Sequence, residues 1–129
     1  MYVWTKPFFV FAAVYDGLLG LAFLFVPMAI FAHYGVEPPN HPAYVQFPAL
    51  LLLVFSAMFL RIASNPVKHY GLIPYGMALK ASYCGLAFWY QLAGSIPDMW
   101  IPWAWADLAF LIVFILSWLN LRPRLGDSE

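Results

Sequence analysis

The stretch from Trp103 to Leu121 reads WAWADLAFLIVFILSWLNL and holds one charged side chain, Asp107, in nineteen residues. About 20 consecutive, mostly apolar residues are enough for an α-helix to cross the hydrocarbon core of a bilayer. This stretch therefore predicts a membrane-spanning helix near the C-terminal end of the chain.

Three further apolar runs of similar length precede it. They occupy residues 8–32, 44–63 and 72–93, and with 103–121 they predict four spans. Pro38 and Pro39 interrupt the chain after the first run, and Pro97 and Pro102 lie between the last two. Because connections this short leave consecutive helices as antiparallel neighbours, we expect residues 1–129 to form one transmembrane domain. The expected fold is all-α, an integral membrane four-helix bundle with up-down topology.

The composition agrees with lipid as the main solvent. Apolar residues make up 64% of the 129 residues and charged residues only 9%, with a mean hydropathy of +0.78. Six basic and six acidic side chains give no net charge, which argues against nucleic acid as a partner. A single cysteine, Cys84, excludes an internal disulfide and any cysteine-rich metal site.

The cations predict the orientation of the spans. Five of the six lie at the N-terminus, in or beside the second loop, or after the last span: Lys6, Arg61, Lys68, Arg122 and Arg124. The first and third loops contain no Lys or Arg, so the positive-inside rule places both termini in the cytoplasm, most simply at a bacterial inner membrane. The first run is about 25 residues long and carries Asp16 in its middle, unlike a signal-peptide core of about 7 to 15 apolar residues. We therefore expect it to remain as a helix in a multi-pass protein.

Tryptophans cluster where the last span begins. Trp100, Trp103 and Trp105 predict an aromatic belt at the outer interface, and Tyr2 and Trp4 mark the inner one.

Three ionisable side chains, Asp16, Lys80 and Asp107, fall inside predicted spans. Each costs about 2.5 to 3.5 kcal/mol at mid-membrane on insertion scales, so such residues are candidates for function. At 1.5 Å per residue, Asp16 and Lys80 each lie roughly 12 to 14 Å from the cytoplasmic boundary, whereas Asp107 and Gln46 lie roughly 22 Å from it. We therefore expect Lys80 to pair directly with Asp16, and to reach Asp107 only through a shift of the helices or a bridging water.

Further polar side chains follow Lys80 at helical spacing. Tyr83 or Cys84, the small residue Ala87 and then Gln91 lie three, four, seven and eleven residues after it, on one face of a helix that we expect to look into the bundle. The candidate ligand-binding or proton-binding residues are Asp16, Gln46, Lys80, Tyr83, Gln91 and Asp107.

The count of buried charges separates two interpretations. A salt bridge that only fixes helix register is one of them. In the other, two carboxylates and one ammonium leave one negative charge over, which a low-dielectric interior does not tolerate. One carboxyl, with Asp107 the preferred candidate, would then be protonated near neutral pH, or hold a cation or the cationic group of a ligand.

Other site chemistries have weaker support. His33, Glu37 and His41 in the first loop are metal-ligating residue types at four-residue spacing, but the prolines between them disrupt a helical face, so we predict no metal. No His falls within a span, so no haem is expected. The chain contains no phosphate-binding loop, HExxH or GxSxG motif, which favours a protein without catalytic activity.

The run YDGLLGL at Tyr15–Leu21, the Arg that ends the second span (Arg61), Lys80 early in the third and Asp107 early in the fourth resemble the DoxX-like family of small bacterial membrane proteins. The resemblance covers nearly the whole chain and rests on loose motifs. It implies a four-helix bundle, in some members an accessory subunit of a quinone-linked oxidoreductase, and it implies that Lys80 and Asp107 belong to one network.

We therefore expect a protein that binds a small lipophilic ligand, such as a quinone, or that acts as an accessory subunit of a membrane complex. The alternative is an oligomeric carrier coupled to protons or ions. The expected partners are the lipid bilayer and either another membrane protein or further copies of this chain.

Overall fold

The computed structural model describes residues 1–122, and Arg124, one of the cations used to predict orientation, lies outside them. These residues form helices and connecting loops, with no β-strand among them. The all-helical class predicted from the sequence is therefore confirmed. The elements in chain order are α1 (Thr5–Phe25), α2 (Pro27–Tyr34), α3 (Ala43–Ser64), the short 3-10 helix η1 (Tyr70–Leu72), α4 (Ile73–Leu92), the 3-10 helix η2 (Asp98–Trp100) and α5 (Ile101–Leu121).

Prolines and glycines set many of the helix ends. Pro27, Pro74 and Pro102 occupy the first turns of α2, α4 and α5, where the missing N–H leaves no hydrogen bond unmade. Gly35 follows α2 with a φ of 66°, and Gly94 closes the turn after α4 with a φ of 81°. Both are left-handed conformations that L-residues with a side chain adopt at a cost.

The first predicted span was wrong in its extent. Residues 8–32 do not form one helix, because α1 ends at Phe25 and α2 starts at Pro27. Val26 between them has φ −133° and ψ 45°, outside the helical region. A residue that precedes proline is disfavoured in the helical conformation, so the Val26-Pro27 pair supplies the physical reason for the break.

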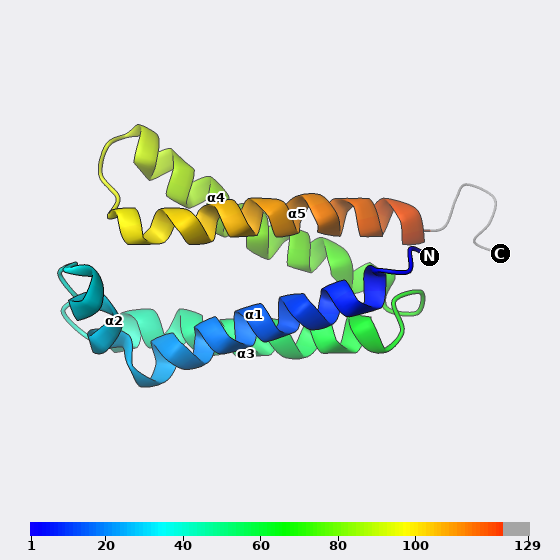
Figure 1. Ribbon diagram of the computed structural model, residues 1–129, viewed down its shortest axis with the longest axis horizontal. Coiled ribbons are helices and arrows are strands. Elements are labelled where there is room, and N and C mark those ends of the chain that lie inside the picture. Colours follow the sequence, from blue (N-terminus) through cyan, green and yellow to red (C-terminus); the bar gives the residue numbers. More distant parts are fainter. Residues whose placement is uncertain (123–129) are drawn as a thin grey trace.

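The long helices form two pairs (Figure 1). α1 packs along α3, and α4 packs against α5, with consecutive long helices running in opposite directions. The N-terminus, the loop after α3 and the last turn of α5 lie at one end of the molecule, while α2 and the connection between α4 and α5 lie at the other. α4 crosses α5 obliquely and diverges from α3 toward its own C-terminal end (Figure 1).

A glycine allows the close approach of α1 and α3. A Cβ at Gly20 would lie 2.8 Å from the Ala49 carbonyl oxygen, which is closer than real Cβ atoms approach a backbone atom. The same Cβ would lie 3.2 Å from the Leu52 Cβ. Two turns nearer the N-terminus of α1, the Ser56 hydroxyl donates a 2.6 Å hydrogen bond to the Ala13 carbonyl. Small residues and interhelical hydrogen bonds are the usual means by which helices pack in a membrane.

Aromatic side chains fill the space between the two pairs at the end of the molecule where the N-terminus lies. Phe9 of α1 stacks on Phe114 of α5 with ring centroids 5.0 Å apart, and Phe59 of α3 lies 5.1 Å from the same ring. All three are fully buried, and Phe110 closes the cluster next to Phe114. This aromatic cluster joins the two pairs at that end of the molecule.

Three helices are long and apolar enough to cross a membrane: Thr5–Phe25, Ala43–Ser64 and Asp98–Leu121, the last of which combines η2 and α5. Their outer faces remain apolar and exposed, as at Val14 and Leu18 of α1 and Val54 of α3. α4, which corresponds to the predicted span 72–93, is not among these three helices. Its 20 residues include Lys80 together with Gly, Ser, Tyr and Gln side chains that lower its hydropathy.

Candidate functional site

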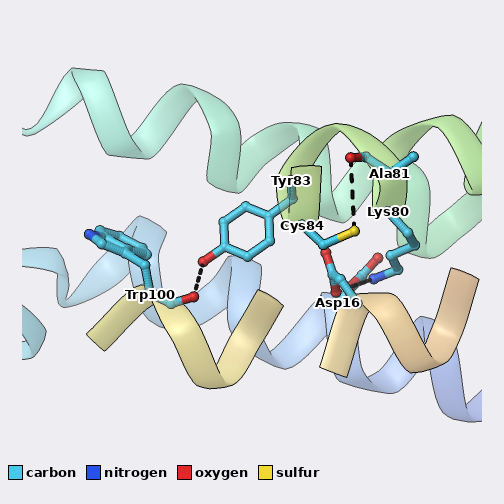
Figure 2. Close-up of polar contacts among 7 residues, drawn as sticks. Asp16, Lys80, Ala81, Tyr83, Cys84 and Trp100 are labelled. Atoms are coloured by element: carbon cyan, nitrogen blue, oxygen red, sulfur yellow. Dashed lines mark hydrogen bonds and ion pairs between the residues drawn. The ribbon is translucent and has the colours of Figure 1, made fainter. Parts of the chain in front are cut away.

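Lys80 lies in the middle of α4 and is 1% exposed. Its Nζ donates one hydrogen bond of 2.7 Å to Asp16 Oδ1 on α1 and another of 3.1 Å to Asp107 Oδ1 on α5. Asp16 is also 1% exposed, and Asp107 is 8% exposed. The ammonium group therefore links the two helix pairs through Asp16, which Figure 2 shows, and joins α4 to α5 through Asp107.

The predicted contact of Lys80 with Asp16 is present, whereas the placement of Asp107 beyond direct reach was wrong. The membrane depth of each residue was calculated from its distance along the helix, which assumes parallel helices that start at one level. α4 instead crosses α5 obliquely (Figure 1), so the levels of residues on different helices do not follow from distance along the chain.

Aromatic rings enclose the ammonium group. Its Nζ lies 4.8 Å from the ring centre of Phe110, 5.3 Å from that of Tyr15 and 6.0 Å from that of Phe59. Ring faces within about 6 Å attract a cation, most strongly where water is absent. These contacts supply stabilisation for a lysine that would otherwise be expensive to bury.

Three buried polar atoms around this ion cluster have no hydrogen-bond partner among residues 1–122. They are Asp16 Oδ2, the Tyr15 hydroxyl and the Trp103 Nε1. The rings of Tyr15 and Trp103 lie 6.4 Å apart. Buried polar atoms are nearly always paired, so unpaired ones beside a cavity identify a place where a further group can bind.

A cavity of about 290 Å³ lies between the helix pairs beside these atoms. Its walls come from α1, α3, α4, α5 and η2 and are largely apolar, as at Leu19, Val45 and Leu52. Asp16 and Asp107 also belong to the lining, whereas Lys80 is not part of the cavity wall.

Tyr83 forms another part of this wall. Its hydroxyl donates a 2.8 Å hydrogen bond to the Trp100 carbonyl, as Figure 2 shows. The Trp100 ring in turn stacks on Phe23 of α1 with centroids 5.6 Å apart. Tyr83 therefore borders the cavity as predicted for an inner-face residue, and its hydroxyl is already used to hold η2 against α4.

The other polar candidates lie elsewhere. The Gln46 side chain donates a 3.0 Å hydrogen bond to the Leu24 carbonyl. This bond satisfies a carbonyl of the last turn of α1, which has no partner within the helix. The placement of Gln91 on the inner face was wrong, because its side chain is exposed in the last turn of α4. That turn lies where α4 has diverged from the other pair (Figure 1).

The loop residues considered as metal ligands are not brought together. Within the described chain, no group of three or more His, Cys, Asp or Glu side chains is placed to hold a metal ion. His33, Glu37 and His41 are all exposed, and His41 Nδ1 accepts a hydrogen bond from the Ala43 N–H. Cys84 is buried, and its Sγ points to the Ala81 carbonyl at 3.9 Å.

Sequence reasoning missed two aromatic residues of the site. Trp103 was assigned to the outer belt, but it lines the cavity with its Nε1 buried. Tyr15 was considered only as part of a motif. A signal was present for both, since Trp103 lies four residues before Asp107 on the same face of α5, and Tyr15 directly precedes Asp16.

Comparison of the chain with protein-family models, with curated proteins and with solved structures finds no match.

Proposed function

We propose that this chain is a multi-pass membrane protein that binds a small lipophilic ligand in the cavity between its helix pairs. In this proposal α1, α3, α4 and α5 cross the bilayer as a four-helix bundle with both termini in the cytoplasm, most simply in a bacterial inner membrane. The ligand contacts apolar walls along its length, and Asp16 and Asp107 at its polar end. No catalytic step is part of the proposal.

Apolar exposure supports the membrane setting. Large apolar side chains are exposed along the outer faces of α1, α3 and α5, and contiguous apolar surface of this kind is rare on soluble monomers. α4 is 20 residues long, enough to span. Its one charge is buried and paired with two carboxylates, which lowers the cost of placing it at mid-membrane.

The cations support the orientation. Lys6, Arg61, Lys68 and Arg122 are all exposed, and they belong to the N-terminus, the end of α3, the following loop and the end of α5. These segments share one end of the molecule (Figure 1). A positively charged end is retained on the cytoplasmic side.

The observation that carries the ligand proposal is the cavity with unpartnered polar atoms at one end. Small-molecule sites are typically apolar pockets of about 300 to 1,000 Å³ with a few polar groups that fix orientation. This cavity is at the small end of that range. Asp16 Oδ2 and Trp103 Nε1 belong to residues of its lining and have no partner in the described chain.

The ligand enters from the bilayer in this account. Pro48 and Leu51 line the cavity and are themselves exposed on α3. Because these lining residues are exposed, a lipophilic molecule dissolved in the hydrocarbon reaches the cavity laterally in this proposal, without passing through water.

Mass spectrometry of the molecules that remain bound to the purified protein tests this function. The Val45→Trp variant fills the cavity, and Val54→Trp makes the same change on the exposed face of the same helix. We expect a lipophilic molecule to co-purify with the wild type and with Val54→Trp, and to be lost from Val45→Trp. Equal recovery of every lipid from all three proteins would contradict a specific site in the cavity.

The alternative is an oligomeric proton- or ion-coupled carrier that uses the same excess carboxylate. The aromatic cluster of Phe9, Phe59, Phe110 and Phe114 fills the space between the ion cluster and the end where the N-terminus lies. A single chain therefore offers no polar route past Lys80 in the described residues, and we favour ligand binding. Proton flux in liposomes that disappears in both Asp16→Asn and Asp107→Asn would favour the carrier instead.

The resemblance to DoxX-like proteins adds a proposal about partners. An accessory subunit of a quinone-linked enzyme would hold a lipophilic molecule beside that enzyme. Purification in mild detergent, directly from native membranes, tests the accessory-subunit proposal. A stable partner enzyme would support the proposal, and a chain that purifies alone or only with its own copies would contradict it.

A further inference from the structure

We infer that the ligand is a lipophilic amine, a compact apolar molecule that carries a single positive charge and binds with that charge against Asp107 and Asp16. This inference rests on the proposed function and specifies the chemical class of the ligand. It follows from which charged groups face the cavity.

The buried charges do not balance. Among residues 1–122 the buried charged side chains are Asp16, Asp107 and Lys80, two acids and one base. One carboxylate would be enough to pair with Lys80 and to fix the register of the helices. The second leaves a negative charge that a medium of low dielectric does not tolerate alone. A proton or a bound cation has to compensate for it.

The two signs of charge are also segregated. Asp16 and Asp107 both belong to the cavity lining, and Lys80 does not. The ammonium of Lys80 lies within 6.0 Å of the ring centres of Phe110, Tyr15 and Phe59. A ligand in the cavity therefore borders two acidic residues and, among the described residues, no basic one.

One acceptor atom of the site, Asp16 Oδ2, lacks a hydrogen-bond donor among the described residues. Asp16 is 1% exposed, its Oδ1 accepts from Lys80, and its Oδ2 has no partner in the described residues. An ammonium group carries up to three donors and would satisfy Oδ2 by a charge-assisted hydrogen bond. An anionic head group would find no basic side chain in the lining.

The remaining walls suit the rest of such a molecule. Tyr83, Trp100, Trp103 and Phe23 supply aromatic surface next to the carboxyl groups. Aromatic faces attract cations and pack against flat apolar groups. The volume of about 290 Å³ equals roughly ten water molecules at the density of the liquid, which suits a compact amine and not a whole phospholipid.

Three probes that share one skeleton separate the charge from the apolar contacts: phenylbutylamine, phenylbutanol and phenylbutyrate. Binding to the purified full chain is followed by calorimetry, and by tryptophan fluorescence because Trp100 and Trp103 border the cavity. We expect the amine to bind about ten- to a hundredfold more tightly than the alcohol, the range of one charge-assisted hydrogen bond, and the carboxylate to bind most weakly.

The matched variants are Asp107→Asn and Asp98→Asn, since Asp98 is an exposed acid at the start of η2. Asp107→Asn leaves Lys80 paired with Asp16, so we expect the variant to fold. It should bind the amine about ten- to a hundredfold more weakly, whereas the alcohol, which carries no charge, should lose much less affinity. Asp98→Asn should bind all three probes like the wild type, and retained alcohol binding in Asp107→Asn shows that the cavity is intact.

The outcomes distinguish this inference from the proposed function. Amine and alcohol that bind equally well, or an amine affinity that survives Asp107→Asn, would overturn the assignment of a cationic ligand and leave a lipophilic site in place. Binding of none of the three probes, with no molecule recovered by mass spectrometry, would overturn the ligand site itself.

Discussion

Replacing Lys80 with methionine is the perturbation that the site geometry makes most informative. Methionine has a similar length and no charge, so the packing of α4 is nearly preserved while both ion pairs are lost. Asp16 and Asp107 would then share a buried site with no cation among the described residues. The unfolding free energy should fall steeply for this reason.

The magnitude follows from burial. Removing one partner of a buried ion pair typically costs about 3 to 5 kcal/mol, because the other charge stays uncompensated. Lys80 is 1% exposed and serves two carboxylates, so we expect a loss in that range. Asp107→Asn leaves the 2.7 Å pair of Lys80 with Asp16 and should cost only about 1 to 2 kcal/mol.

Unfolding by sodium dodecyl sulfate in mixed micelles, followed by circular dichroism, measures these free energies. Lys68→Met is the matched control, since Lys68 is exposed in the loop after α3. Adding Asp16→Asn and Asp107→Asn to Lys80→Met should restore much of the lost stability, because it removes the unpaired acids. A Lys80→Met protein as stable as Lys68→Met would refute the reasoning, and so would a triple variant that recovers nothing.

Two further changes test the packing around the site. Gly20→Ala should destabilise the protein by about 1 to 3 kcal/mol, because the added Cβ would lie 2.8 Å from the Ala49 carbonyl oxygen. Gly85→Ala is the control and should not destabilise the protein, since nothing lies within 4 Å of a Cβ at that position. Equal effects of the two changes in the same unfolding assay would contradict the close approach of α1 and α3. Tyr83→Phe should cost about 0.5 to 1.5 kcal/mol by removing the 2.8 Å bond that holds η2, and the exposed Tyr75→Phe should cost nothing measurable; a Tyr83→Phe protein with unchanged stability would show that this bond does not contribute.

The sequence was sufficient for the helical class and for the approximate position of each long helix, because apolar runs and prolines specify both. The break at Val26 was missed although Pro27 signals it, since the hydropathy of the run continues across the proline. The lower apolarity of α4 follows from the same polar residues that mark it as the helix of the site.

The sequence predicted which residues form the candidate site more accurately than it predicted the contacts among them. Buried ionisable residues can be recognised within an apolar run, so Asp16, Lys80 and Asp107 were all named. Their contacts depend on how α4 crosses α5, which no spacing along one helix encodes. Trp103 was assigned to the interface because tryptophan is common there, whereas its position one turn before Asp107 places it on the cavity.

Infrared difference spectroscopy of the carboxyl groups tests the excess of buried acid most directly. The account predicts that protein freed of bound lipophiles shows the band of a protonated buried carboxyl, absent from Asp107→Asn, and that this band disappears when phenylbutylamine binds. A ligand-free protein without such a band, or a band that the amine leaves unchanged, would contradict the claim that one buried carboxyl lacks a positive partner until a cationic ligand binds in the cavity.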